Sequence, residues 1–219
     1  MNFNIIDMGA WKRSKTFEHF TREVPCTYSM TVNIEAAKLL RSAEERGIGF
    51  FPAFLHCLTR VVNAHEEFRM DFDAKGHVGY YDISHPCWAV FDKEDESFTT
   101  LWTEYSPDLT EFYARYDKTM RAFKKLGAQP KPAPRNIFNV SCIPWTSFTG
   151  FNLNLRDGYA YLPPIFTVGK YSSEGGGVQL PLAIQVHHAV CDGWHVSRFV
   201  SELQEAADSV RSAESDGRA

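Results

Sequence analysis

Apolar and polar residues alternate strictly over residues 178–186, where every even-numbered position is aliphatic. Period-two alternation is typical of a β-strand that places one face on a hydrophobic core. After residue 193 the period changes, because Val196, Phe199 and Leu203 recur at the spacing of one helix face with polar residues between them. The pattern therefore predicts a strand, a short turn and an amphipathic helix.

The predicted turn carries the titratable residues His187, His188 and Asp192, and it ends at Gly193, whose backbone freedom suits a sharp turn. If the parity of the strand continues, His188 points with Val186 to the protected side and His187 points the other way. Partial desolvation there favours the neutral imidazole that a general base needs near neutral pH. A hydrogen-bonded core histidine is the alternative that the pattern leaves open.

The rest of the chain mixes helices and strands without βαβ regularity, which predicts an α+β fold, a two-layer sandwich of a mixed β-sheet with helices. We expect one domain over residues 1–219 with a frayed polar tail at 211–219. The expected helices span residues 11–22, 35–46, 51–65 and 106–125. The expected strands span residues 26–34, 87–91, 98–103, 137–142, 151–155 and 165–170, with a proline loop at 129–134 and a glycine turn at 175–177.

Composition narrows the class of protein. The formal net charge is −4 and no Lys/Arg cluster stands out, which argues against nucleic acid as a partner. No apolar run approaches membrane-spanning length, and residues 1–10 lack the pattern of a secretion signal. Five cysteines without a CxxC pair indicate reduced thiols. We therefore expect a cytoplasmic protein that binds neither nucleic acid nor membrane.

Residues 187–193, HHAVCDG, resemble the HHxxxDG signature of the chloramphenicol acetyltransferase superfamily, which acyltransferase cores of 2-oxo acid dehydrogenase complexes and condensation domains of peptide synthetases share. Other stretches, up to about Leu203, are similar to chloramphenicol acetyltransferases themselves. They are Trp11-x-Arg13-xxx-Phe17, Val24-Pro25-Cys26, residues 139–145 (NVSCIPW), 151–154 (FNLN), 167–171 (TVGKY) and 180–196.

The resemblance implies transfer of an acetyl group from acetyl-CoA to the hydroxyl of chloramphenicol in a ternary complex, and hence antibiotic resistance. His188 would be the general base, a role worth roughly 10²–10⁴ in rate. Ser141 would donate to the oxyanion, which is worth on the order of 10²–10³, and Thr167 would hold a water nearby. Asp192 would pair with Arg13, and removing one partner of such a buried pair costs about 3–5 kcal/mol.

The resemblance also implies the remaining parts of the site. The acceptor pocket would consist of Phe20, Cys26, Phe98, Asn139, Phe151 and Leu153. The coenzyme, acetyl-CoA as a co-substrate, would meet Trp145, Lys170 and Tyr171, and no metal is implied. The family is trimeric with sites at subunit junctions, so we expect a homotrimer that binds chloramphenicol or a similar small alcohol.

Three departures from the family pattern concern mainly the acceptor. A Phe-Pro step that is common before the Ser141 strand is replaced by Gly127-Ala128-Gln129-Pro130, Phe20 replaces a common Tyr, and Trp194 replaces a common Phe. The alternatives are the same chemistry on another xenobiotic or metabolite alcohol and a non-catalytic trimeric drug-binding relative. A metal-dependent hydrolase using His187, His188, Asp192 or His195 is disfavoured, because adjacent histidines on opposite strand faces do not easily share an ion.

Overall fold

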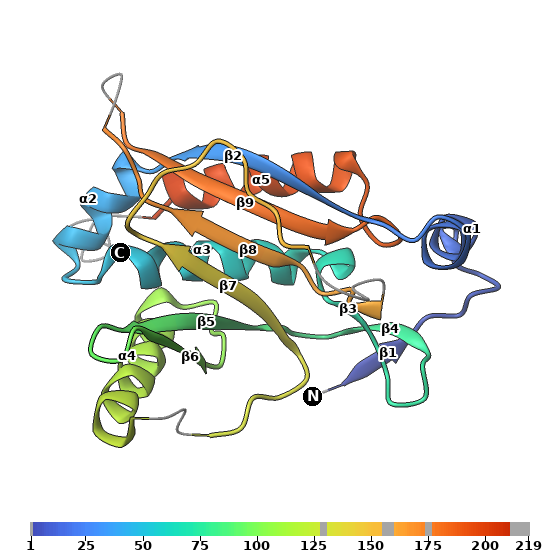
Figure 1. The fold of residues 1–219 in the computed structure, drawn as a ribbon, viewed down its shortest axis with the longest axis horizontal. Coiled ribbons are helices and arrows are strands. Elements are labelled where there is room, and N and C mark those ends of the chain that lie inside the picture. The colour runs from blue at the N-terminus through green and yellow to red at the C-terminus, as the bar shows by residue number, and fades with distance from the viewer. Residues whose placement is uncertain (1, 128–130, 155–159, 174–176, 211–219) are drawn as a thin grey trace, which may run out of the picture.

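A six-stranded mixed sheet forms the centre of the molecule (Figure 1), and the computed structural model describes residues 2–127, 131–154, 160–173 and 177–210. The strand order is β2-β9-β8-β7-β5-β6, in which β7 runs parallel to β5 and β8 and the other neighbours are antiparallel. The strands are β2 (Thr27–Glu35), β5 (His85–Asp92), β6 (Ser97–Trp102), β7 (Ile137–Ile143), β8 (Ile165–Gly169) and β9 (Gln179–His187).

Helices cover one face of this sheet, so the α+β fold expected from the sequence is confirmed (Figure 1). The long helices α3 (Phe50–Ala64) and α5 (Gly193–Asp208) pack against each other, with α2 (Ala37–Glu45) beside them. Helix α4 (Leu109–Leu126) lies near β5 and β6. Apolar side chains that point from the strands to the helices form the core, including Phe138, Val140, Phe166, Leu182 and Ile184.

The ends of α4 follow the local signals that predict it. The carboxylate of Asp108 accepts a hydrogen bond of 2.7 Å from the backbone N–H of Glu111, which satisfies one of the free donors of the first turn. At the other end Gly127 adopts a left-handed conformation with φ of 66°, the usual C-terminal glycine stop. Residues 106–125 were therefore a good prediction of this helix.

The first expected helix differs from its prediction. The chain makes turns up to Arg13, then forms α1 (Ser14–Glu18) and continues as a π-helix, η1 (His19–Glu23), closed by a bond from Val24 N–H to the His19 carbonyl. A single amphipathic helix over residues 11–22 is thus wrong. The wider π turn is common at functional sites, and here it carries Phe20 onto the turn after β9.

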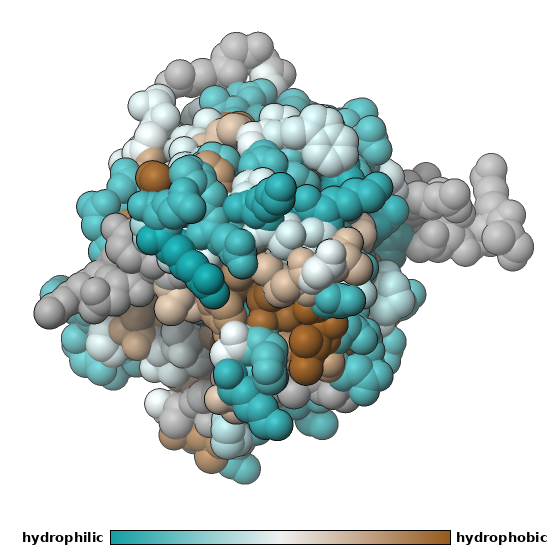
Figure 2. Space-filling model, turned by 90° about the vertical axis from the view of Figure 1, so that its right-hand side faces the viewer, coloured by the Kyte–Doolittle hydropathy of each residue, from teal (hydrophilic) through white to brown (hydrophobic). Residues whose placement is uncertain are grey.

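A small antiparallel sheet, β1-β4-β3, lies at the same end of the molecule as α1 (Figure 1). It consists of β1 (Phe3–Ile5), β3 (Met70–Phe72) and β4 (Val78–Tyr81), and the short 3-10 helix η2 (Glu66–Phe68) precedes β3. Figure 2 views this end and shows apolar surface gathered at its centre, surrounded by hydrophilic side chains. Ile5 and Val24 are among the exposed apolar residues, at 58% and 51%.

The strand that the sequence pattern marks most clearly, β9, is buried on both faces rather than one. It lies between β2 and β8, and all its residues from Leu180 to His187 are buried. The strand also ends at His187, so its parity does not extend to His188. As a result His187 is the more buried imidazole, 1% exposed, and the prediction that His188 faces the protected side by strand parity is wrong.

The second face of β9 is covered by a segment that was expected to be a strand. Residues 151–154 form no strand, although Leu155 lies outside the described residues. The backbone N–H of Phe151 donates to Thr31 Oγ1 (3.3 Å) and that of Leu153 donates to Gln185 Oε1 (2.8 Å). Because side chains of β2 and β9 supply these acceptors, the segment lies across the sheet instead of joining its ladder.

Several other expected features fall on residues that the structure does not describe. The expected tail at 211–219, most of the glycine turn at 175–177 and part of the proline loop at 129–134 belong to this set. The departure at Gly127-Ala128-Gln129-Pro130 is described only at Gly127. The expectation of a single domain over the whole chain stays a prediction.

Candidate active site

The turn after β9 is closed by its own backbone. The N–H groups of Val190 and Cys191 donate to the carbonyl of His187 at 3.1 and 3.0 Å. Asp192 then has extended backbone angles and caps the first turn of α5. Gly193 is not among the residues with positive φ, and a side chain added there meets no atom within 4 Å. The expectation that this turn needs the freedom of Gly193 is therefore wrong.

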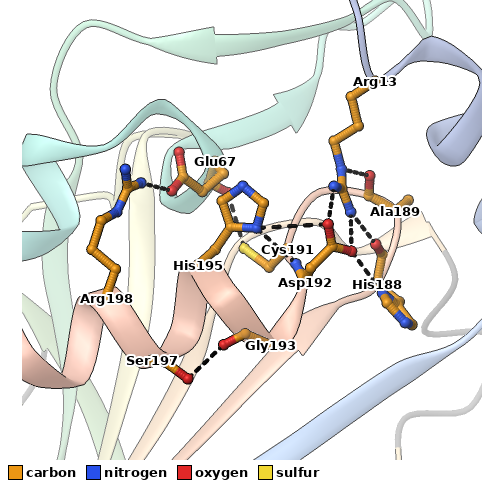
Figure 3. A network of polar contacts seen from close by, with 10 residues as sticks. All are labelled: Arg13, Glu67, His188, Ala189, Cys191, Asp192, Gly193, His195, Ser197 and Arg198. Atoms are coloured by element: carbon orange, nitrogen blue, oxygen red, sulfur yellow. Dashed lines mark hydrogen bonds and ion pairs between the residues drawn. The ribbon is translucent and has the colours of Figure 1, made fainter.

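Arg13 holds the turn from the opposite side (Figure 3). Its Nε donates to the Ala189 carbonyl at 2.7 Å and its Nη2 donates to the His188 carbonyl at 2.8 Å. Its Nη1 and Nη2 also donate to the two carboxylate oxygens of Asp192, at 2.5 and 2.7 Å. The expected pairing of Arg13 with Asp192 is thus present, and the planar guanidinium fork is suited to such a bidentate contact.

The electrostatics of this pair keep Asp192 ionised. The hydrogen bond from Arg13 is the largest cause that lowers the pKa of Asp192, partly opposed by desolvation. The Arg13 side chain is 16% exposed, whereas the Asp192 side chain is 41% exposed. Because one partner remains in contact with water, the pair is worth less than the 3–5 kcal/mol expected for a buried pair.

His188 lies between aromatic rings on the outer side of the turn. Its ring stacks on Phe20 with 3.9 Å between centroids and meets the edge of Tyr28 at 5.3 Å. Its Nδ1 is buried and lies 3.4 Å from a carboxylate oxygen of Asp192. The side chain is 32% exposed, so its accessible edge is the one that carries Nε2. A proton on Nδ1 facing the carboxylate leaves the accessible nitrogen with a lone pair.

Ser141 lies on β7, on the sheet face opposite the helices. It is half-buried, and the register of the sheet aligns it with Thr167 on β8, which in turn aligns with Ala183 on β9. Residues aligned across a ladder point to the same face. The Ser141 and Thr167 hydroxyls therefore lie side by side on this face, where Thr167 is 2% exposed.

Within one subunit the two parts of the candidate site are far apart. The register aligns Ser141 with Ala183, and His188 follows Ala183 by five residues and lies on the other side of β8. At about 3.3 Å per residue the two positions are roughly 17 Å apart along the sheet alone. This separation is too large for one small alcohol to touch both side chains of the same subunit.

The expected acceptor residues divide between these two regions. Phe20 and Cys26 lie at the histidine, since the Cys26 carbonyl accepts from the backbone N–H of His188 at 3.1 Å. On the serine side, Asn139 precedes Ser141 by two residues on β7, and the segment carrying Phe151 and Leu153 crosses the sheet. Phe98 lies elsewhere, in a cluster of aromatic rings with Phe91 and Trp145.

The expected coenzyme residues gather where β7 and β8 end. The backbone N–H of Lys170 donates to the carbonyl of Thr146 at 2.9 Å, which places the segment after β8 beside the residue that follows Trp145. Trp145 is 54% exposed and Tyr171 is 43% exposed, with the Tyr171 ring edge-on to Phe50. An exposed indole, a phenol and a lysine near the Ser141 strand suit a long, polyanionic acyl carrier.

Three residues near the site were not singled out from the sequence. Tyr28 touches the His188 ring, Tyr161 OH accepts a 2.6 Å bond from Asn139, and Gln185 accepts from Leu153. Burial raises the pKa of Tyr161 to about 12, so its hydroxyl stays protonated. Tyr28 follows Cys26 by two residues within the strand expected at 26–34, and this spacing on one strand face was a usable signal. Tyr161 had no such local signal.

Metal-ligand clusters and membrane-spanning helices were sought in the described part of the chain. No group of three or more His, Cys, Asp or Glu side chains there is arranged to hold a metal ion. No helix within the described ranges is long and apolar enough to cross a bilayer.

Comparison with known proteins identifies the family of this chain. The chloramphenicol acetyltransferase family matches residues 1–204. A chloramphenicol acetyltransferase of Campylobacter coli is 50% identical over 207 residues, which cover 94% of this chain and 98% of the relative. One of Clostridium perfringens is 47% identical over 211 residues, which cover 95% and 96%.

Solved structures support the fold. A structure named chloramphenicol acetyltransferase superposes with a TM-score of 0.82 at 24% identity, covering 94% of this chain and 100% of the other. A dihydrolipoamide acetyltransferase of Azotobacter vinelandii superposes with a TM-score of 0.66 at 14% identity, covering 90% and 87%. With the family match, the high identity to these relatives and the shared fold, this chain belongs to the chloramphenicol acetyltransferase family of enzymes.

Proposed function

We propose that this enzyme transfers the acetyl group of acetyl-CoA to the hydroxyl of chloramphenicol in a ternary complex, and so confers resistance to the antibiotic. The observation that carries the proposal is the anchored His188 ring, with its buried nitrogen near Asp192 and its other edge accessible. The names of the relatives at 47–50% identity support chloramphenicol as the acceptor.

In the proposed reaction Nε2 of His188 takes the proton of the acceptor hydroxyl as its oxygen attacks the thioester carbonyl. The new C–O bond forms, the C–S bond breaks, and the proton passes from the imidazolium to the departing sulfur. Asp192 is not a proton relay in this scheme. Its carboxylate and Arg13 hold the turn, and the negative charge beside Nδ1 stabilises the imidazolium that forms.

The second half of each site comes from another copy of the chain. Ser141 of that copy donates its hydroxyl to the developing oxyanion, and Thr167 beside it binds a water. The separation of about 17 Å within one subunit supports this arrangement, because a single subunit does not bring both groups to one acceptor. A contact between two different surfaces closes into a ring when it repeats, and we propose three copies.

The apolar surface at the end of the molecule that carries α1 supports contact with a second copy (Figure 2). A monomer rarely exposes large apolar patches, and such surfaces mark sites of association. Phe20 and Cys26 lie close to this end and form one wall of the acceptor pocket. Asn139, Phe151 and Leu153 of the other copy form the opposite wall, whereas Phe98 packs with Phe91 and Trp145 apart from it.

Acetyl-CoA approaches along the ends of β7 and β8. The Trp145 and Tyr171 rings contact the pantetheine arm, and Lys170 binds a phosphate. These side chains are exposed near Ser141, which suits a carrier whose thioester has to reach the oxyanion donor. Five cysteines without a disulfide and a substrate made inside cells support a cytoplasmic location.

The test is a thiol-release assay with acetyl-CoA and chloramphenicol, run beside a panel of other alcohols. Wild-type enzyme is expected to release coenzyme A with chloramphenicol, and His188→Ala is expected to lose about 10²–10⁴ in turnover. His77→Ala is the matched control, because His77 is an exposed imidazole whose bond to Asp73 lies in the turn between β3 and β4.

Different outcomes of the assay test the acceptor, the enzymatic activity and the role of His188 separately. Turnover with another alcohol but not with chloramphenicol would refute the acceptor and keep the chemistry. No thiol release with any alcohol would refute the enzymatic proposal in favour of a drug-binding protein. Near-normal turnover of a folded His188→Ala variant would refute the role of the histidine.

A further inference from the structure

A second histidine is bonded into the anchored turn. The backbone N–H of Asp192 donates to Nδ1 of His195 at 2.9 Å, while the backbone N–H of His195 donates to the carboxylate of Asp192. This reciprocal pair is a capping box at the start of α5, a position where Glu or Gln usually stands three residues after the cap. In α5 the titratable imidazole of His195 thus occupies a capping-box position that the non-titrating amide of Gln also suits.

The direction of this bond defines the protonation state of His195. Because Nδ1 accepts the Asp192 N–H, it carries a lone pair, and the proton of the neutral ring is on Nε2. Figure 3 shows the second ring nitrogen pointing away from Asp192. Protonation of Nδ1 would replace its lone pair with a second N–H. Nδ1 and the Asp192 backbone would then both be donors, and the hydrogen bond between them would be lost.

Charged groups from three elements face the His195 ring. Glu67 comes from η2, Arg13 precedes α1, and Asp192 and Arg198 belong to the turn and to α5, with Arg198 bonded to Glu67. Glu66 and Lys12 line the same cavity, of about 560 Å³. Desolvation is the largest cause that lowers the pKa of His195, and Glu67 opposes it. The neutral ring is therefore the form present at neutral pH.

A continuous path of bonds leads from His195 to the proposed base. Asp192 is held by His195 on its backbone and by Arg13 on its carboxylate, and Arg13 in turn holds the carbonyl of His188. We infer that neutral His195 is a positioning residue that keeps Asp192, Arg13 and the His188 turn in their catalytic arrangement, so that protonation of His195 in acid lowers the activity. This inference rests on the proposed function.

The pH dependence follows from the sign of the shift. The pKa of His195 in the folded protein lies below the ordinary value near 6.5, so the bond from Asp192 is intact above that value. The bond is lost as the pH falls through the lowered pKa, and the stability that it contributes is lost over the same range. As the His195 bond is lost, kcat of the wild-type enzyme should fall on the acid side by up to the factor that removal of the acceptor causes.

The decisive comparison uses His195→Gln, His195→Ala and the control His77→Gln. The glutamine side-chain oxygen accepts the Asp192 N–H at every pH, whereas alanine has no acceptor. At pH 8 we expect His195→Ala to lose roughly tenfold in kcat, with KM for both substrates changed less than about threefold. We expect His195→Gln to stay within about threefold of wild type at pH 8 and to escape the part of the acid-side loss of kcat, up to about tenfold, that follows protonation of His195.

Circular dichroism and oligomer size are measured first, so that a misfolded His195→Ala variant is recognised. If that variant is misfolded, the inference is tested with His195→Gln. A folded His195→Ala enzyme with wild-type kcat, or a His195→Gln enzyme whose kcat falls in acid as steeply as that of the wild type, would overturn the inference. If wild-type enzyme releases no thiol at all, the proposed function fails instead. Unfolding temperatures from pH 5 to 8 then still test the network, because both His195 variants lack the titrating ring and should flatten the loss of stability on the acid side, whereas His77→Gln should not. An unchanged profile of both His195 variants would overturn the inference.

Discussion

The separation of His188 from Ser141 makes a strong prediction about mixed oligomers. His188→Ala and Ser141→Ala each remove one half of every site, so each variant alone is expected to lose on the order of 10² or more in turnover. When the two variants share one oligomer, some sites receive His188 from one copy and Ser141 from its neighbour. Those sites contain both residues, although every subunit in the mixture lacks one of them.

The size of the effect follows from the geometry. Within one chain the two residues are roughly 17 Å apart along the sheet, so the proposed site draws them from different copies. In a random equal mixture half of the subunits supply His188 and half supply Ser141. The chance that a given junction receives both is one half times one half, and the mixture should therefore recover about one quarter of wild-type turnover.

The assay co-expresses the two variants with different affinity tags and measures thiol release after both tags have been selected. Selection for mixed oligomers raises the recovered activity somewhat above one quarter. The control mixes His188→Ala with His188→Gln, which lack the same group and should restore nothing. Mixed oligomers of His188→Ala and Ser141→Ala as inactive as either parent would refute the shared site, and with it the oxyanion role of Ser141 across the junction.

Two further predictions concern stability. Arg13→Ala leaves the carbonyls of His188 and Ala189 without a charged donor. At roughly 1.5 kcal/mol for each such bond, the free energy of unfolding should fall by about 2–3 kcal/mol. A change below about 1 kcal/mol in urea unfolding would contradict the anchoring role. Gly127→Ala forces a side chain onto a residue with φ of 66° and should cost about 1 kcal/mol, whereas Gly193→Ala, without positive φ and with open space around it, should cost nothing. Equal thermal shifts for the two glycine variants would show that the reasoning about φ is wrong.

Local patterns were enough to predict most of the helices and strands. The ends of α4 follow from Asp108 and Gly127, and β9 follows from its alternation, because these signals depend on neighbours within a few residues. The resemblance in residues 187–193 and at Arg13 identified the pair that holds the turn. Local patterns failed where a segment bonds to residues distant in sequence. Residues 151–154 are an example, because their backbone N–H groups donate to side chains of β2 and β9.

The sequence by itself determined the fold class and the enzyme family, since these depend on periodicity and on recognisable motifs. Only the tertiary structure decided that β9 is covered on both faces, that Phe20 and Tyr28 meet His188, and that His195 accepts the Asp192 N–H. The physical reason is that strand register and the packing of the sheet bring together residues far apart in the chain, and no local pattern contains that information. The same register separates His188 from Ser141 in one subunit, which is why the proposed site needs a second copy.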